Sequence, residues 1–361
     1  MVTSLTVFFV LYLTTVTSVL IANYCCYNLV IMKHRLTTMA FISLLALTAC
    51  GTKKYEPKDY ILELDYKSDF RILQLTDIHL SDKDDKELQY KFMDKIYESA
   101  LKDGKIDLVV VTGDLFTFAG KGTAKSLLNY LDGKNIPWTV CFGNHDEQCY
   151  FSVDWLTETL SNYGSNCLFK DLQDDQVNGN CNFVINLKEG DKVHDQLFIM
   201  DSNRYNFGFS QLGYDCFKQD QIDWYESIVL DAKKNNGGKP VNSLMFYHIP
   251  LPEINDAWEA AQKDKSLLKY GEKREASCPP DHDYGFFKKI KELGSTSAMF
   301  FGHDHINDFE VDYEGVKFCY GIKSTDRIYH DDDMLGGQTI TIHDDHSLEI
   351  NRYFHTYEEV K

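Results

Sequence analysis

Short apolar, β-prone runs alternate with amphipathic helical patterns from about residue 70 onward, and this alternation most strongly limits the fold. Strands are predicted at residues 71–75, 107–111, 138–142, 182–187, 196–200, 243–247, 297–301, 316–321, 338–342 and 348–354. Helices are predicted at residues 85–101, 123–132, 153–163, 219–234 and 284–293, from apolar residues that recur on one helical face. Apolar strands that alternate with helices predict an α/β layered fold. The strand-rich end of the chain predicts additional antiparallel strands.

Five of these strands are followed directly by residues of the types that bind metals. They are Asp77 with His79, Asp114, Asn144 with His145 and Asp146, His248, and His303 with His305. Each group alone is a common loop feature, but the carboxyl ends of such strands meet at one edge of a sheet, where α/β folds build their sites. Oxygen and imidazole ligands together suit Zn, Mn or Fe. Gly113, Gly143 and Gly302 beside them would let the backbone approach closely.

The ordered pattern Asp-x-His, Gly-Asp, Gly-Asn-His-Asp, His and Gly-His-x-His, from Asp77 to His305, resembles that of the calcineurin-like metallophosphoesterases. The strings PWTVCFGNHDE, YHIPLPE, GEKRE and GHDHINDF are similar to the exported branch related to purple acid phosphatases, of the Dcr2 or PAP29 type. The resemblance implies an α/β fold in the form of a four-layer α/β/β/α sandwich of two mixed sheets. It also implies a dinuclear metal site at the C-terminal ends of the strands.

The resemblance also implies a role for each residue of the pattern. One metal ion would be held by Asp77, His79 and His305, the second by Asn144, His248 and His303, and Asp114 would bridge both. His145 would face the substrate phosphate, and Asp146 would orient His145. The ions would be divalent or trivalent Mn, Fe or Zn, with a solvent hydroxide between them. Thr117 stands where purple acid phosphatases carry an iron-binding Tyr, so no tyrosinate–iron colour is expected.

Hydrolysis of phosphomonoesters or phosphodiesters is the function that this pattern predicts. Two cations about 3.5–4 Å apart bind phosphoryl oxygens, acidify water and stabilise the charge on the attacking and leaving oxygens. The polar segment 252–283 is predicted to be a long loop, in which Lys273 and Arg274 would bind substrate through their charges and Trp258 and Tyr270 could stack on it. Two alternatives stay open, since a fold does not determine function: a catalytically silent metal-binding scaffold, and a lipoprotein that binds a solute without chemistry.

The N-terminus has the features of an export signal. Lys33, His34 and Arg35 precede a 14-residue uncharged run, Leu36 to Ala49, that ends in the lipobox-like string LTAC. Residues 32–49 are therefore predicted to be a lipoprotein signal peptide, with lipid attachment at Cys50. A transmembrane anchor is the alternative, but it needs about 20 apolar residues.

The remaining segments follow from that signal. Met32 begins it cleanly, so residues 1–31 are interpreted as an upstream translation artefact, residues 50–68 as a tether and residues 69–355 as a single phosphoesterase domain. Export would permit disulfides, and Cys167 with Cys181 is a possible pair. The run from His343 to His346 is interpreted as a solvated turn in preference to a further metal site.

The charge of the chain limits its partners. Asp and Glu outnumber Lys and Arg by 55 to 37, which gives a net charge of −18. Such a surface repels phosphate backbones, so no nucleic-acid partner is expected. A small phosphorylated substrate is compatible with this charge, because bound metal ions reverse the local sign. The expected partners are that substrate and, through the lipid anchor, a membrane.

Overall fold

The computed structural model describes residues 60–170, 177–208 and 211–360. The predicted signal peptide, Cys50 and most of the predicted tether lie outside the described residues. No helix in the described part of the chain is long and apolar enough to cross a membrane.

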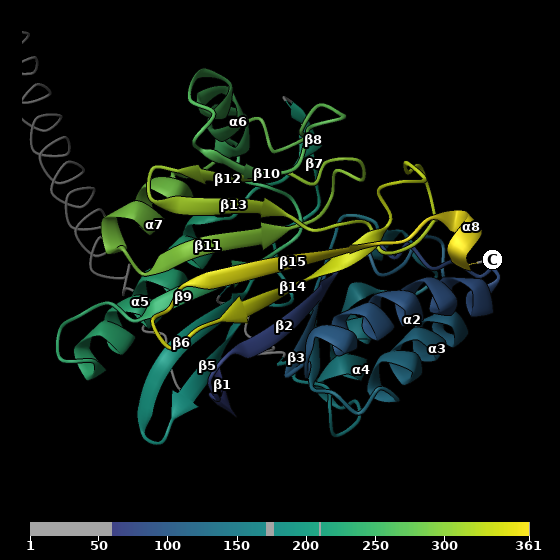
Figure 1. Cartoon of the computed structure of the whole chain (residues 1–361), viewed down its shortest axis with the longest axis horizontal. Coiled ribbons are helices and arrows are strands. Elements are labelled where there is room, and N and C mark those ends of the chain that lie inside the picture. Colours follow the sequence, from purple (N-terminus) through teal and green to yellow (C-terminus); the bar gives the residue numbers. More distant parts are fainter. Residues whose placement is uncertain (1–59, 171–176, 209–210, 361) are drawn as a thin grey trace, which may run out of the picture. The chain divides into compact units, whose positions relative to one another are not determined.

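A five-stranded sheet carries the first half of the phosphoesterase pattern. Its strand order is β15-β14-β2-β3-β4; β2, β3 and β4 run parallel, and β14 runs antiparallel to β2. The strands are β2 (Phe70–Leu75), β3 (Leu108–Thr112), β4 (Trp138–Cys141), β14 (Gly336–Ile342) and β15 (Leu348–Phe354). The helices that follow β2, β3 and β4 are α2 (Lys86–Asp103), α3 (Lys121–Asp132) and α4 (Val153–Ser161), and they lie together on the outer side of this sheet (Figure 1). A 3-10 turn, η2 (Asp146–Gln148), separates β4 from α4.

An eight-stranded sheet carries the second half, in the order β1-β5-β6-β9-β11-β13-β12-β10. Its four central strands β6, β9, β11 and β13 run parallel, and antiparallel strands flank them. Its strands are β1 (Ile61–Asp65), β5 (Phe183–Glu189), β6 (Lys192–Ile199), β9 (Asn242–Phe246), β10 (Leu268–Tyr270), β11 (Thr296–Phe301), β12 (Glu310–Tyr313) and β13 (Val316–Tyr320). A separate ribbon pairs β7 (Tyr205–Gly208) with β8 (Gln211–Tyr214).

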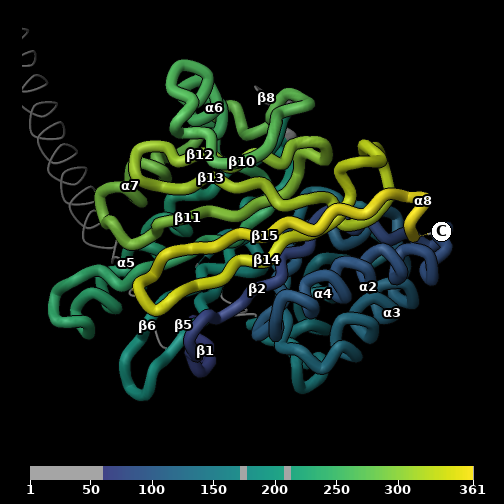
Figure 2. Tube along the Cα trace, viewed as in Figure 1, coloured from purple at the N-terminus to yellow at the C-terminus, as the bar shows by residue number. Residues whose placement is uncertain are grey.

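The eight-stranded sheet is buried on both faces. Along β9, Leu244 and Phe246 join the core shared with the five-stranded sheet, whereas Met245 and the following Tyr247 join a second core. This alternation follows from the two-residue period of a strand. The second core is covered by α5 (Gln219–Asn235), α6 (Glu253–Lys263) and α7 (Phe286–Leu293), and a short helix, α8 (Tyr357–Val360), packs beside α2. The predicted α/β/β/α sandwich is confirmed, and Figure 2 shows the C-terminal β14 and β15 (yellow) beside β2 (purple) from the start of the domain.

Two predictions about segments are corrected. The predicted tether extends too far, because Ile61–Asp65 forms β1 and pairs in parallel with β5. The segment 252–283 is not one loop, because it contains α6 and β10. In α6, Ile254, Ala257 and Ala261 are buried, so small Ala side chains supply most of the apolar face and the pattern is easily missed. The seven cysteines of the described residues, including Cys167 and Cys181, are free thiols.

Candidate metal centre

The predicted ligand residues come together at one edge of the molecule. Asp77 and His79 follow β2, Asp114 follows β3 and Asn144 follows β4, all of which are parallel strands of one sheet. In the eight-stranded sheet, His248 follows β9. His303 and His305 follow β11, which pairs in parallel with β9. The carboxyl ends of both sets of strands therefore supply the site, as the sequence pattern predicts.

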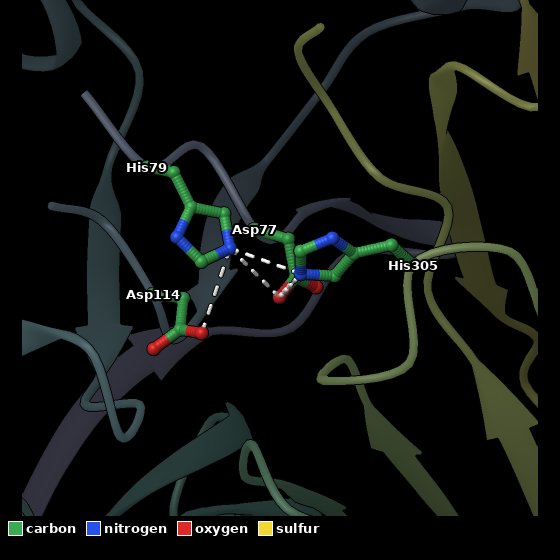
Figure 3. Close-up of side chains that lie close together, drawn as sticks. All are labelled: Asp77, His79, Asp114 and His305. Carbon is green, nitrogen blue, oxygen red and sulfur yellow. Dashed lines mark hydrogen bonds and ion pairs between the residues drawn. The ribbon is translucent and has the colours of Figure 1, made fainter. Parts of the chain in front are cut away.

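Four of these residues form a compact group: Asp77, His79, Asp114 and His305. Their ligand atoms lie within 4.8 Å of one another, and all four residues are buried. Figure 3 shows the two imidazole rings and the two carboxylates pointing toward one another. The Nε2 atoms of His79 and His305 are 3.0 Å apart, and Nε2 of His79 is 3.6 Å from Oδ2 of Asp114. This is the set predicted for the first metal ion together with the bridging carboxylate.

Asp114 also contacts the second predicted set. Its Oδ2 atom lies 3.1 Å from Nε2 of His248, whose ring centroid is 5.2 Å from that of His303. One carboxylate thus reaches ligand residues from both sheets, which is the position required of a bridging ligand.

The donor atoms of the site fit bound cations. Four of the predicted ligand atoms are buried and take part in no hydrogen bond within the described structure: Asp77 Oδ1, Asn144 Oδ1, His248 Nε2 and His303 Nε2. Buried polar atoms in folded proteins normally have a partner. Carboxylate, amide and imidazole donors together suit Zn, Mn or Fe, so the residues present fit a pair of metal ions.

The backbone around the site is strained and closely packed. Asp77, His79, Asp114 and His303 have φ values of 53°, 51°, 50° and 81°, in the left-handed region that few residues other than Gly adopt. Strain of this kind persists at functional sites that the surrounding fold holds in place. A Cβ atom at Gly143 would lie 2.2 Å from Oδ1 of Asp114, and one at Gly302 would lie 2.5 Å from Oδ2 of Asp77. Glycine at these positions therefore allows the two carboxylate ligands to approach the backbone.

Hydrogen bonds orient the ligand side chains from behind. The Nδ1 atoms of His79, His248 and His305 lie 2.8, 2.8 and 2.9 Å from Thr117 Oγ1, Thr112 O and Tyr329 O respectively. These contacts turn each Nε2 atom toward the predicted ions, as in known metal sites. The amide Nδ2 of Asn144 donates to the Tyr205 hydroxyl at 2.8 Å, which leaves Oδ1 for a metal. Thr117 thus supports a ligand histidine at the position where purple acid phosphatases carry Tyr.

The electrostatics of the site favour cations. Burial opposes ionisation of Asp114, but the adjacent His248 and His79 hold its pKa well below the ordinary value. Burial likewise opposes ionisation of Asp77, whose pKa is nevertheless lowered by the adjacent imidazoles of His305 and His79. Burial lowers the pKa of His79 and that of His303 to about 3. At Asp77, Asp114, His79 and His303 the site therefore combines ionised carboxylates with neutral imidazoles, the forms that bind metals.

Two basic groups balance this negative charge. Burial lowers the pKa of His248, but Asp114 outweighs burial and raises it to about 10. Lys323 is also buried, and its Nζ atom donates to the backbone carbonyl of Asp77 at 2.8 Å. Burial lowers the pKa of Lys323 to about 8. Nothing in the local sequence around Lys323 indicates this contact, because it depends on the loop after β13 crossing the end of β2.

The predicted role of Asp146 as the partner of His145 is not supported. Its carboxylate accepts hydrogen bonds from the backbone N–H groups of Phe116 and Gly143, at 3.0 and 2.8 Å, so it joins the loops after β3 and β4. Burial raises the pKa of Asp146 to about 8. Nδ1 of His145 lies instead 2.7 Å from Oε1 of Gln148. The spacing of His145 and Gln148, one turn apart in the sequence, is the signal that could have identified this contact.

Arg274 and Lys273, predicted to bind substrate, are engaged elsewhere. The Arg274 guanidinium contacts three carboxylates: Glu272 at 2.7 Å, Asp331 at 3.0 Å and Asp333 at 2.5 Å. These contacts raise the pKa of Arg274 and occupy its donors. Lys273 lies over the ring of Trp258, at 5.9 Å from the ring centroid, and Arg352 covers Tyr270 in the same way at 3.8 Å. The structure therefore gives these side chains contacts with other residues of the protein in place of the predicted substrate contacts.

A cavity of about 400 Å³ adjoins the metal centre at His79 and Thr117. Phe118, Tyr150 and Ile328 form its apolar walls, and its charged lining has both signs, Lys83 and Arg327 with Asp82 and Asp84. The three apolar side chains are 57%, 71% and 47% exposed, which is unusual for large hydrophobic residues. The sequence motifs do not indicate this cavity, because its walls come from the loops after β2, β3, η2 and β13.

The chain belongs to the calcineurin-like phosphoesterase family, which residues 70–307 match. Its relatives include a protein of Arabidopsis thaliana described as probable inactive purple acid phosphatase 14, which is 28% identical over 76% of this chain and 75% of its own length. Phosphatase DCR2 of Saccharomyces cerevisiae is 25% identical over 81% of this chain and 54% of its own length. A dimetal phosphatase from Danio rerio has the same fold, with a TM-score of 0.53 and 12% identity over 81% of this chain and 97% of that chain.

Proposed function

We propose that this protein hydrolyses phosphomonoesters or phosphodiesters at a pair of metal ions. The observation that carries the proposal is the convergence of Asp77, His79, Asp114, Asn144, His248, His303 and His305, four of which present buried ligand atoms that take part in no hydrogen bond. Membership of the calcineurin-like phosphoesterase family supports it. Bound cations would acidify a water molecule and neutralise the oxygens of the phosphoryl group.

His145 is the residue proposed to act on the substrate. Its backbone N–H donates to Oδ1 of Asp114 at 2.7 Å, and its ring lies edge-on to that of His79 with the centroids 5.0 Å apart. Because the Gln148 amide oxygen accepts a hydrogen bond from Nδ1, the Nε2–H of the protonated ring would be left to donate to a phosphoryl oxygen or to protonate the leaving alkoxide. His145 is partly exposed, so a substrate can reach it.

The cavity beside His79 indicates where the organic part of the substrate would bind. A phosphoryl group at the metal centre would place its leaving group near Phe118, Tyr150 and Ile328. A volume of about 400 Å³ is in the range of ordinary small-molecule sites. A small phosphorylated molecule is therefore the proposed substrate class, and nucleic acid is not expected.

The competing function is a catalytically silent metal-binding scaffold, which the description of one relative as probably inactive favours. The test is hydrolysis of a panel of aryl and alkyl phosphomonoesters and phosphodiesters by protein reconstituted with Mn, Fe or Zn. We expect turnover that a chelator abolishes and that added metal restores. If folded, metal-loaded protein hydrolyses none of these substrates, the protein is a metal-binding scaffold and not a phosphoesterase.

We also propose that the protein is exported and anchored in the membrane by a lipid on Cys50. The proposal rests on the basic, apolar and LTAC segments of residues 33–50. Metabolic labelling with a fatty acid should label the wild-type protein and not Cys50→Ser. The variant should stay uncleaved by the lipoprotein signal peptidase or should be lost from the membrane fraction. An unlabelled wild-type protein would refute the anchor. Mass spectrometry of the precursor would show whether translation begins at Met32.

A further inference from the structure

A second group of metal-ligand residues lies far from the phosphoesterase centre. It consists of His194, Asp195 and His346, hereafter the hairpin cluster, whose ligand atoms lie within 4.8 Å of one another. Asp195 pairs with Asn242, the first residue of β9, whereas the predicted metal ligand His248 follows the end of that strand. At ~3.3 Å per residue these six positions span about 20 Å. The hairpin cluster therefore lies at the opposite edge of the eight-stranded sheet.

A β-bulge brings two adjacent side chains of β6 together. Leu187 of β5 pairs with Asp195 and Lys188 pairs with Val193, so His194 is an extra residue in the strand. Successive side chains of a regular strand point to opposite faces, whereas a bulge redirects one of them. Nδ1 of His194 accordingly contacts the carboxylate of Asp195. The local backbone is thus built to place both groups on one site.

The third residue comes from the other sheet. His346 lies in the turn that joins β14 and β15, and this turn lies beside β6 (Figure 1). The backbone of His346 is left-handed, with a φ of 65°, and its Nδ1 atom lies 3.3 and 3.2 Å from the two carboxylate oxygens of Asp195. The sequence predicted a solvated turn here, but His346 contacts the buried carboxylate of Asp195.

The contacts around the hairpin cluster leave two ring nitrogens facing one carboxylate. Nε2 of His194 lies 3.3 Å from the carbonyl oxygen of Asp344, which can only accept, so this nitrogen carries the proton of a neutral ring. Nδ1 of His194 then presents a lone pair to Asp195, which is fully buried. A cation between these groups, either a proton or a metal ion, is needed to hold them together.

Further contacts fix the ligands in place. The ring of Tyr66 stacks on that of His194, with the centroids 3.8 Å apart and an interplanar angle of 7°. Its hydroxyl donates to Oδ1 of Asp344 at 3.0 Å, and Nδ2 of Asn242 donates to Oδ1 of Asp195 at 2.6 Å. Supporting hydrogen bonds of this kind are typical of metal ligands. The His346 side chain is 42% exposed, which provides an entry path and room for a water ligand.

We propose that His194, Asp195 and His346 bind one divalent transition-metal ion that joins the β14–β15 turn to β6. Two imidazole nitrogens and one carboxylate oxygen, completed by water, form a ligand set that suits Zn²⁺. Tetrahedral bonds of about 2.0–2.1 Å place ligand atoms about 3.3 Å apart, which matches the separations of His346 Nδ1 from the Asp195 oxygens. Nδ1 of His194 contacts the carboxylate more closely and would move away from it when the ion binds. The ion would stabilise the contact between the two sheets and would take no part in phosphoester hydrolysis.

The test compares His346→Ala with the control His343→Ala. His343 lies in the same turn but contacts Asp69 at 2.6 Å, outside the hairpin cluster. After saturation with zinc and removal of free metal at pH 7.5, mass spectrometry of metals should give one ion fewer per chain for His346→Ala than for wild type or His343→Ala. Phosphatase activity should be equal in all three proteins, because neither histidine lies near the phosphoesterase centre.

Two further measurements keep the proposal falsifiable if a variant folds poorly. Zinc at about 100 times its Kd should raise the Tm of the wild-type protein by a few degrees, and the gain should disappear near pH 5, where the histidines bind protons. Anomalous diffraction at the zinc edge from wild-type crystals should show a peak between His194 and His346. Equal metal content in wild type and His346→Ala, or no anomalous peak at this place, would overturn the proposal and assign the cluster to a proton-held ion pair.

Discussion

The Nε2 atoms of His79 and His305 lie 3.0 Å apart, although 226 residues separate them in the chain. Each ring is held through its Nδ1 atom, by Thr117 and by the Tyr329 carbonyl respectively. Two neutral imidazoles that face each other across buried carboxylates are arranged for a shared cation. The phosphoesterase centre is therefore assembled by the contact between the two sheets, and its metal affinity depends on groups behind the ligands.

Asp114→Asn should weaken both metal positions, because Asp114 contacts His79 at 3.6 Å and His248 at 3.1 Å. We expect fewer than one metal ion per chain in place of two, and a loss of at least about 100-fold in kcat/KM, which corresponds to about 2.7 kcal/mol. Metal analysis and steady-state kinetics measure these changes. Asp154→Asn, on the exposed surface of α4, is the control. Loss of one ion only, with activity retained, would contradict the bridging role.

Thr117→Val should lower metal affinity without removing a ligand. The substitution keeps the shape of the side chain but removes the hydroxyl that lies 2.8 Å from Nδ1 of His79. Loss of such a supporting hydrogen bond typically costs about 10–100-fold in metal affinity or activity. Competition with a chelator measures the affinity, and Thr117→Ser should restore most of it. If Val and Ser behave alike, the hydroxyl has no part in orienting His79.

Gln148→Leu should lower kcat by about 10-fold with little change in KM, because Gln148 positions His145 and contacts the proposed ligand Asn144 only through Tyr205. The pH profile of kcat separates positioning from a structural role. In Gln148→Glu, a carboxylate beside the imidazole favours the protonated form of His145. The fall of kcat on the alkaline side of the pH profile should therefore move to higher pH. An unchanged profile would mean that Gln148 only supports the loop.

Phe118 should contribute to binding the leaving group, although its backbone conformation lowers the stability of the folded protein. It is 57% exposed and has a φ of 51°, a backbone conformation that costs about 1 kcal/mol or more for most residues. Phe118→Ala and Phe118→Asn should both raise KM for aryl phosphates more than for small alkyl phosphates. Because Asn tolerates the left-handed region, the Asn variant should unfold at a higher temperature than the Ala variant. Equal KM changes for all substrates would remove Phe118 from the leaving-group site.

The sequence by itself determined most of the strands, the layered fold and the residues proposed as metal ligands. These features are local, because an apolar run of strand length followed by Asp, Asn or His specifies both the strand and the side chain at its end. The prediction of β2, β3, β4, β9 and β11 was therefore confirmed, and their ligand residues were brought together. The parallel arrangement of neighbouring strands then brings these residues together, since it places the carboxyl ends of the strands at one edge of the sheet.

Only the tertiary structure decided which residues support those ligands. Asp146 was expected beside His145, but the turn of η2 directs it to the backbone of Phe116 and Gly143 and places Gln148 there. Arg274 was expected to bind substrate, but Asp331 and Asp333 reach it across the fold and occupy its donors. These outcomes depend on loops that meet from distant parts of the chain. Hydrogen bonds and ion pairs require contact within about 3–4 Å, and a separation that small is specified only once the packing of the two sheets has brought those loops together.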